Sequence, residues 1–172
     1  MKSDYIKSNY SFSYSTKGIF IIDNNTQKKS KVSFSRFNKS TTIKGKILNT
    51  KFVIKSVVET KIKLRSHPHI QRNDTYERIV YLNDQKIGKL TRDFELIQGL
   101  NAIAGIPTII RIGEYRIIYF HPYIRKIELF KGAELLGYTK KKKDTYDLYT
   151  KNEETIPLLL SLCLATFDSS IL

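Results

Sequence analysis

The last part of the chain, Thr155 to Phe167, is the only long apolar run in the sequence and limits the fold more than any other feature. Its leucines are unbranched at Cβ and favour a helix, Thr155 can act as the N-cap, and Pro157 falls in the first turn, where a missing N–H is tolerated. Apolar residues point in nearly every direction around the axis, so the helix should be buried. Its predicted core residues are Leu158, Leu159, Leu160, Leu162, Leu164 and Phe167.

The length of this helix argues against a membrane anchor. At a rise of about 1.5 Å per residue it spans roughly 18 Å, whereas the hydrocarbon core of a bilayer is ~30 Å thick. The N-terminus has polar residues where a signal peptide needs an apolar run. The single cysteine, Cys163, lies within the apolar stretch and cannot form an internal disulfide. We therefore expect a cytoplasmic protein without a transmembrane segment.

Short alternating segments fill the chain ahead of the helix. The clearest alternation runs from Val58 to Arg65 and predicts a half-buried strand with a basic outer face. Residues 79–92 and 127–140 resemble each other, and each predicts a β-hairpin that closes on a glycine, Gly88 or Gly137. Residues 108–120 predict a further hairpin around Gly113.

About a dozen strands and one terminal helix indicate a mainly β protein, either an antiparallel sheet closed as a barrel or one folded as a sandwich. The length of 172 residues favours a single domain at 10–172, preceded by a polar segment, 1–9, that can fray. A barrel of a dozen strands is too wide for its own side chains to fill. The apolar helix can supply the missing core.

The ending from Leu158 to Asp168 and the hairpins at Gly88 and Gly137 resemble the tubby C-terminal-like fold. This fold is shared by tubby proteins, phospholipid scramblases and LURP-one-related proteins, and the ending is most similar to the last two. The resemblance covers nearly the whole chain. It implies an antiparallel closed barrel of about twelve strands around a buried hydrophobic C-terminal helix.

The function implied by this resemblance differs between branches. Tubby proteins bind phosphoinositide headgroups, scramblases concern phospholipids, and many LURP-one-related proteins have no assigned chemistry. The sequence lacks the proline-rich N-terminal region, the cysteine cluster and the membrane-spanning extension after Asp168 that scramblases have. The lipid-binding residues of tubby proteins also cannot be matched one by one to residues of this sequence. The resemblance therefore predicts lipid recognition in general terms, without scramblase activity.

The chain carries a formal net charge of +14, from 30 Lys and Arg against 16 Asp and Glu. Such a balance attracts anionic membranes, nucleic acid or acidic proteins, although a solvated lysine-rich surface gives the same composition. The densest basic run is Lys140, Lys141, Lys142 and Lys143, and a second basic stripe consists of Lys61, Lys63 and Arg65 on one strand face. These are the predicted binding residues for an anionic headgroup, and each basic residue near a membrane contributes ~1 kcal/mol.

These patterns favour a noncatalytic binding or scaffold protein, peripheral at a membrane surface, that recognises anionic phospholipid headgroups. The alternative is a bacterial or phage protein-interaction module or regulatory factor that recognises an acidic protein. Nucleic acid is the weaker partner because no RNA-recognition, zinc-finger or helix-turn-helix pattern is present.

Catalytic and cofactor motifs are also missing from the sequence, so neither an enzyme nor a cofactor is predicted. His67 and His69 share a face if their segment is extended, and His121 is the only other histidine. Two spaced histidines are too few ligands to predict a metal site.

Overall fold

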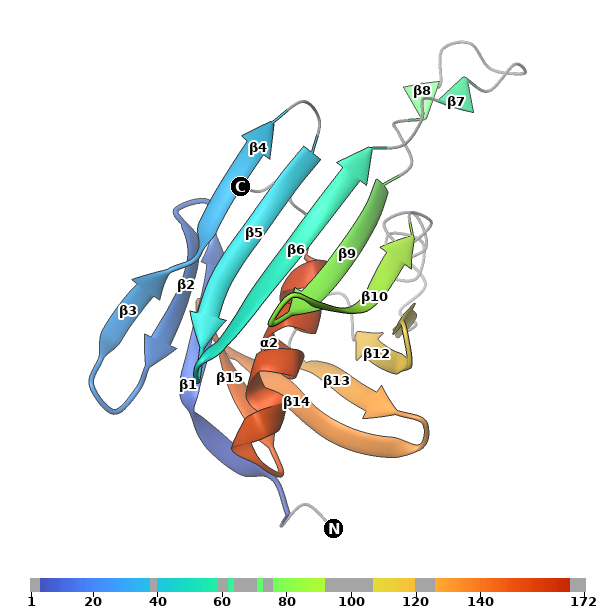
Figure 1. Cartoon of the computed structure of the whole chain (residues 1–172). Coiled ribbons are helices and arrows are strands. Elements are labelled where there is room, and N and C mark those ends of the chain that lie inside the picture. Colours follow the sequence, from blue (N-terminus) through green and yellow to red (C-terminus); the bar gives the residue numbers. More distant parts are fainter. Residues whose placement is uncertain are drawn as a thin grey trace.

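Two antiparallel sheets lie on either side of one buried helix in the computed structural model of this chain (Figure 1). The structure describes residues 4–37, 40–58, 62–63, 71–72, 76–91, 107–119 and 126–167. The eight-stranded sheet has the order β11 (Thr108–Ile112), β12 (Tyr115–Tyr119), β13 (Lys126–Lys131), β14 (Glu134–Lys142), β15 (Thr145–Thr150), β1 (Ile6–Ser15), β2 (Gly18–Asp23) and β3 (Lys28–Lys31). The five-stranded sheet has the order β10 (Gln85–Thr91), β9 (Tyr76–Leu82), β6 (Thr50–Val58), β5 (Ser40–Ile47) and β4 (Ser33–Phe37).

The remaining elements are short. Strands β7 (Ile62–Lys63) and β8 (Gln71–Arg72) form a separate antiparallel pair. The 3₁₀ helix η1 (Glu153–Thr155) leads directly into the helix α2 (Ile156–Thr166). The described residues are therefore mainly β, with an α-helix in the C-terminal part of the chain, as the sequence predicts.

All three predicted hairpins are confirmed. β9 and β10 are joined by Asn83 and Asp84, whose φ values of 44° and 65° are typical of a tight two-residue turn. β11 pairs with β12 around Gly113, and β13 pairs with β14. The turn of the last hairpin lies at Gly132 and Ala133, one residue later than predicted.

Two predicted strand boundaries differ from the structure. β1 begins at Ile6, which pairs with Thr150, so ordered structure starts ahead of Tyr10. Val58 is the last residue of β6. Apart from the two residues of β7, the strand that the alternation predicts from Val58 to Arg65 lies outside the described residues.

One extended segment passes from the first sheet to the second at Val32. Residues 28–31 pair with β2, the N–H of Val32 donates to the carbonyl of Ile19 at 2.9 Å, and residues 33–37 then pair with β5. Val32 itself is buried. A strand that switches sheets makes a covalent corner, so the two sheets are joined along this side.

The opposite sheet edges, β10 and β11, touch at two glycines. A Cβ at Gly88 would lie 2.5 Å from the amide nitrogen of Gly113, and a Cβ at Gly113 would lie 2.4 Å from the carbonyl oxygen of Ile87. Only glycine allows the two backbones to come this close. Among the described residues neither sheet closes on itself, so the twelve-stranded closed barrel stays a prediction.

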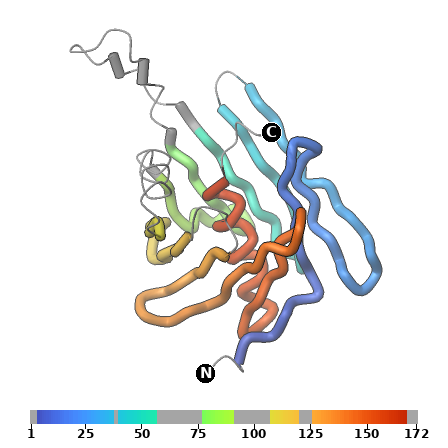
Figure 2. The backbone as a smooth tube through the Cα atoms, turned by 180° about the vertical axis from the view of Figure 1, so that it is seen from behind, coloured from blue at the N-terminus to red at the C-terminus, as the bar shows by residue number. Residues whose placement is uncertain are grey.

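Helix α2 runs between the sheets and packs against β6, β9 and β15 (Figures 1 and 2). Of the six predicted core residues, the five that are buried are Leu159, Leu160, Leu162, Leu164 and Phe167. Leu158 is partly buried at the margin of the core, which corrects its prediction as a full core residue. The hydroxyls of Ser161 and Thr166 donate to carbonyls of their own helix, at 3.1 Å and 2.7 Å, so they add no unpaired polar group to the apolar surroundings.

The predicted N-cap is wrong. Thr155 makes no side-chain cap for α2. Instead, the Asn152 side chain accepts hydrogen bonds from the N–H and the hydroxyl of Thr155, at 3.1 Å and 2.6 Å. The extra turn η1 moves the start of helical structure three residues towards the N-terminus, so asparagine takes the capping role that the sequence assigns to threonine.

A buried arginine holds the C-terminal end of α2. Arg78 on β9 is only 5% exposed, and its Nη1 donates to the carbonyl oxygens of Ala165 at 2.8 Å and Phe167 at 2.5 Å. The last carbonyls of a helix have no hydrogen-bond donor within the helix and carry partial negative charge. A guanidinium both donates hydrogen bonds to them and balances that charge. This contact fixes the end of α2 against the five-stranded sheet.

We expect Leu160→Ala to lower the free energy of unfolding by about 2–5 kcal/mol, because it leaves a cavity among fully buried side chains. Leu158→Ala is the matched control, since the same atoms are removed from a partly buried position. Urea unfolding of both variants measures the difference. Equal losses would show that α2 does not pack with Leu160 at its centre.

We expect Arg78→Met to lower the free energy of unfolding by about 2–4 kcal/mol, since charge-assisted hydrogen bonds contribute about 1.5–3 kcal/mol each and removal of a buried charge offsets part of the loss. Arg111→Met on the exposed face of β11 is the control and should stay within about 0.5 kcal/mol of the wild type. Chemical denaturation measures both variants. An unchanged stability of Arg78→Met would contradict a structural role for the contact.

Candidate functional site

The predicted lysine run lies at the tip of the hairpin formed by β14 and β15. Lys140, Lys141 and Lys142 end β14, Lys143 begins the turn, and all four are exposed. Other lysines are ion-paired, for example Lys7 with Asp147. Within the described part of the chain, none of the four has a carboxylate within salt-bridge distance.

The four lysines do not project as one group, because neighbouring residues of a strand face opposite sides. Lys140 and Lys142 lie on the outer face of the eight-stranded sheet, opposite Asp147 and Thr145, whereas Lys141 lies on the inner side at the open end. The Nζ of Lys141 lies 5.8 Å from the centre of the Tyr146 ring. Burial raises the pKa of Tyr146 to about 12, so this ring is uncharged at neutral pH.

Lys140 belongs to a patch of tyrosines that the sequence analysis did not find. Tyr138 and Tyr149 are cross-strand neighbours whose rings stack at 4.8 Å, with 3° between their planes. The Nζ of Lys140 lies 5.7 Å and 5.1 Å from their centres, and that of Lys126 lies 5.3 Å from Tyr138. Cation–π contacts at exposed sites contribute about 0.5–1 kcal/mol. The alternation of Tyr138 with Lys140 was visible in the sequence, but the partner Tyr149 follows only from the register.

These contacts show that the four lysines, Lys140 to Lys143, have different roles. Lys140 and Lys141 lie over tyrosine rings and stabilise the sheet. Among the described residues, the ammonium groups of Lys142 and Lys143 contact neither a carboxylate nor a ring, so these two are available to a ligand.

Lys143 takes a backbone conformation that favours glycine. Its φ is +54°, in the left-handed region, where a Cβ is crowded by the neighbouring carbonyl. The turn is closed on its other side by the Thr145 hydroxyl, which donates to the Lys142 carbonyl at 3.0 Å. A lysine at this φ lowers the stability of the turn, whereas a glycine would not.

The hairpin tip lies near the end of α2, together with the turn after β1 and the tip of β4. The Phe167 ring stacks on Tyr14, close to the end of β1, at 4.6 Å. On the other sheet, Arg36, Thr41, Ser56 and Arg78 are successive cross-strand partners, and Arg78 holds the end of α2. The tip of β4 and the turn after β1 therefore share this end of the molecule, as Figure 1 shows for both. We call it the helix-exit end and define it by Lys17, Arg36, Phe37, Lys142, Lys143 and Asp144.

Charge differs between the two ends of the molecule. At the helix-exit end, Asp144 is the one carboxylate in the described turns, and Glu77 near the start of β9 is ion-paired with Lys89. The opposite end, where α2 begins, carries in or beside its turns Asp23, Asp84, Glu114, Glu134, Glu153 and Glu154. The excess of positive charge in the turns is therefore concentrated where α2 ends.

Local contacts keep the acids of the opposite end ionised. The Thr26 hydroxyl and the Asn25 N–H hold the pKa of Asp23 below its ordinary value. The Nζ of Lys131 lies 3.1 Å from Oε1 of Glu114 and lowers the pKa of this carboxyl group. These carboxylates balance the lysines around them, and no comparable balance exists among the described turns at the helix-exit end.

The second predicted basic stripe is not placed beside the first. Lys61 and Arg65 lie outside the described residues, as does the side chain of Lys63, whose backbone belongs to β7. The histidines His67, His69 and His121 also lie outside the described residues.

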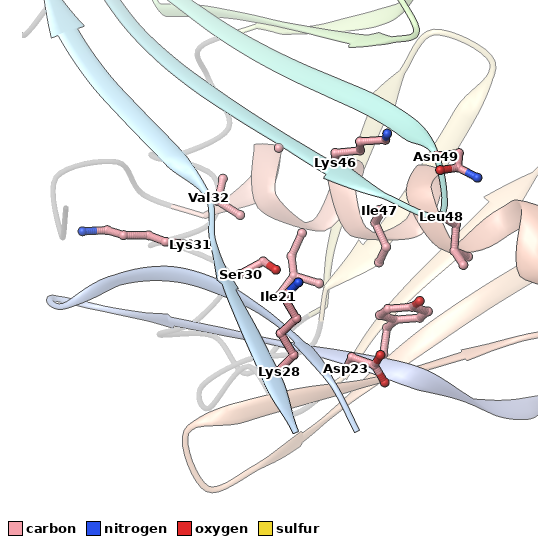
Figure 3. A pocket seen from close by; sticks show the side chains of 12 residues that line it. Ile21, Asp23, Lys28, Ser30, Lys31, Val32, Lys46, Ile47, Leu48 and Asn49 are labelled. Carbon is pink, nitrogen blue, oxygen red and sulfur yellow. The ribbon is translucent and has the colours of Figure 1, made fainter. Parts of the chain in front are cut away.

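A half-open cleft of about 600 Å³ lies beside the corner at Val32 (Figure 3). Ile21 and Ile47 contribute apolar lining, and Lys31 points away from the other labelled residues. Lys28 is the cross-strand partner of Asp23, whose charge offsets it. Lys46 also lines this cleft, so Asp23 offsets only part of its positive charge.

A second cleft, of about 580 Å³, lies on the other side of Val32 and reaches the helix-exit end at the turn after β1. Lys17 and Lys31 line it together with the hydroxyl residues Thr16 and Ser33. None of its described lining residues is acidic. Its composition suits a small anionic group better than that of the first cleft.

The next features among the described side chains are metal-ligand clusters and the cysteine. Within the described ranges no cluster of three or more His, Cys, Asp or Glu could hold a metal ion. Cys163 lies in the core, and burial raises the pKa of its thiol, which makes it a poor nucleophile.

No protein-family model matches this chain, and no curated protein or solved structure shows significant similarity to it. Among the described helices, none combines the length and the apolar character needed to cross a membrane. Function is therefore inferred from the fold and from the distribution of charge.

We expect Lys143→Gly to raise the free energy of unfolding by about 0.5–1 kcal/mol, because it relieves a left-handed backbone at the hairpin tip. Lys143→Ala removes the same charge and keeps the unfavourable φ, so its stability should stay close to that of the wild type. Thermal and urea unfolding distinguish the two. If both variants gain stability equally, charge repulsion between the lysines is the cause and the backbone is not.

Proposed function

We propose that this protein is a noncatalytic binding domain that attaches to the anionic phospholipid surface of a membrane through its helix-exit end. The observation that carries the proposal is the concentration of unpaired lysines in turns and at strand ends here, of which Lys142 and Lys143 are the clearest. A binding site made of turn residues can meet a flat surface, whereas the sheet faces are interrupted by ion pairs.

The expected strength of this attachment follows from simple electrostatics. Each basic residue close to an anionic surface contributes ~1 kcal/mol, and the effect falls off within a Debye length of about 8–10 Å. Lys17, Arg36, Lys142 and Lys143 together give about 4 kcal/mol, reduced by Asp144. The proposed binding is reversible and strongly weakened by salt.

The cleft beside Lys17 supports the same ligand chemistry. Two ammonium groups and two hydroxyls can donate to a phosphate, and its described lining residues contribute no carboxylate to repel one. The adjacent apolar residue Phe34, which is partly buried, can contact the glycerol region of a lipid. Attachment at the cytoplasmic side of a membrane, where anionic lipids are enriched, fits this chemistry.

We also propose that the complete chain forms a tubby-like barrel. Three features support this: α2 lies between the sheets, Val32 joins them at one corner, and Gly88 meets Gly113 at the other. A full closure would need further pairing between the edges β10 and β11. The lipid-binding proposal does not depend on that closure.

The double variant Lys142→Glu/Lys143→Glu should lose most of its binding to phosphatidylserine-containing vesicles, because two attractive charges become repulsive. Co-sedimentation at low salt measures the bound fraction. The matched control is Lys51→Glu/Lys86→Glu, which makes the same change of net charge at the opposite end of the molecule. Equal losses in both variants would assign binding to overall charge, and a wild type that fails to sediment would refute the proposal.

A further inference from the structure

The most exposed large apolar side chain of the described structure is Phe37, at the tip of β4. Its exposed fraction is 76%, against 57% for Ile109 and 71% for Ile6. It is the last residue of an edge strand and pairs with Ser40. An isolated exposed hydrophobic residue needs no explanation by itself. The position of Phe37 in the fold therefore decides whether its exposure indicates a function.

Phe37 lies beyond the level at which α2 ends. The preceding residue, Arg36, is aligned through Thr41 and Ser56 with Arg78, which bonds to the last carbonyls of the helix. Phe37 is one residue further along β4, where the five-stranded sheet has its tip (Figure 1). Ile109, in contrast, lies within a sheet face, opposite Ile118 of β12.

The charges around Phe37 have the sign that suits a lipid surface. Arg36 is next to it, Lys17 lies in a turn at the same end, and Lys142 ends β14 there. Aromatic side chains with basic neighbours favour the boundary between headgroups and acyl chains, since the ring leaves water while the charges stay among phosphates. A protruding tip cannot enclose a small ligand, but it can enter a layer of lipid.

We propose that Phe37 is the residue that inserts into the lipid headgroup region when the helix-exit end docks on an anionic membrane. This inference rests on the proposed lipid-binding function and adds the depth and orientation of the bound protein. Electrostatic attraction brings the basic turns to the surface, and the Phe37 ring is then buried below the phosphates. The long axis of α2 points towards the membrane at its C-terminal end.

Tryptophan fluorescence can test this directly, because the chain contains no tryptophan. Phe37→Trp places a single reporter at the tip, and Ile109→Trp places one on the sheet face as a control. On vesicles of phosphatidylcholine and phosphatidylserine, we expect the emission of Phe37→Trp to move to shorter wavelength and to be quenched by brominated lipid. The emission of Ile109→Trp should stay unchanged.

A second pair of variants measures the contribution to affinity. Phe37→Ala should weaken binding to the same vesicles about tenfold, the effect expected for the loss of one partly buried aromatic side chain. Ile109→Ala should bind as the wild type does. Both positions are exposed, so both variants should melt at the wild-type temperature.

The outcomes separate the two proposals. Sedimentation with anionic vesicles without a shift for Phe37→Trp would overturn the insertion and leave the lipid-binding function standing. Absence of sedimentation together with an unshifted emission would overturn both. An equal shift on neutral vesicles would support insertion and refute the role of charge. If polyglutamate but not vesicles shifts the emission of Phe37→Trp, Phe37 contacts an acidic protein partner, and the insertion proposal is overturned.

Discussion

The contact of Arg78 with the end of α2 gives the core a defined geometry. An apolar helix surrounded by apolar strands is stabilised on every side, but such contacts have little directional preference. The two hydrogen bonds from Nη1 fix the height of the helix end against β9. The stacking of Phe167 on Tyr14 fixes the same end against the other sheet. Both sheets are thereby aligned with one helix terminus.

This alignment explains how residues far apart in the sequence share one end of the molecule. In an antiparallel sheet every second turn lies at the same end. Lys17, Arg36 and Lys143 belong to such turns or strand ends, and the acidic turn residues around Asp84 and Glu134 belong to the alternate set. The separation of charge is therefore a product of topology as much as of composition.

The same topology assigns different roles to residues that look alike in sequence. Lys140 and Lys141 lie over tyrosine rings, whereas Lys142 and Lys143 extend from the hairpin tip. Most apolar residues likewise fill the core, and among the described residues the large exposed ones are Ile6, Ile109 and Phe37, of which Phe37 is the one at the helix-exit end. The proposed binding to an anionic surface, through a basic tip with one apolar residue, builds on this division.

The sequence by itself determined the local structure: the hairpins, the burial of α2 and the basic excess all follow from alternation, turn residues and apolar content. It misplaced the cap at Thr155, because a 3₁₀ turn capped by Asn152 is not visible in a pattern of apolar residues. Only the tertiary structure decided the role of Arg78, the stacking of Tyr138 on Tyr149 and the position of Phe37. These depend on cross-strand register and sheet order, which arise from contacts between distant residues that local propensities do not encode.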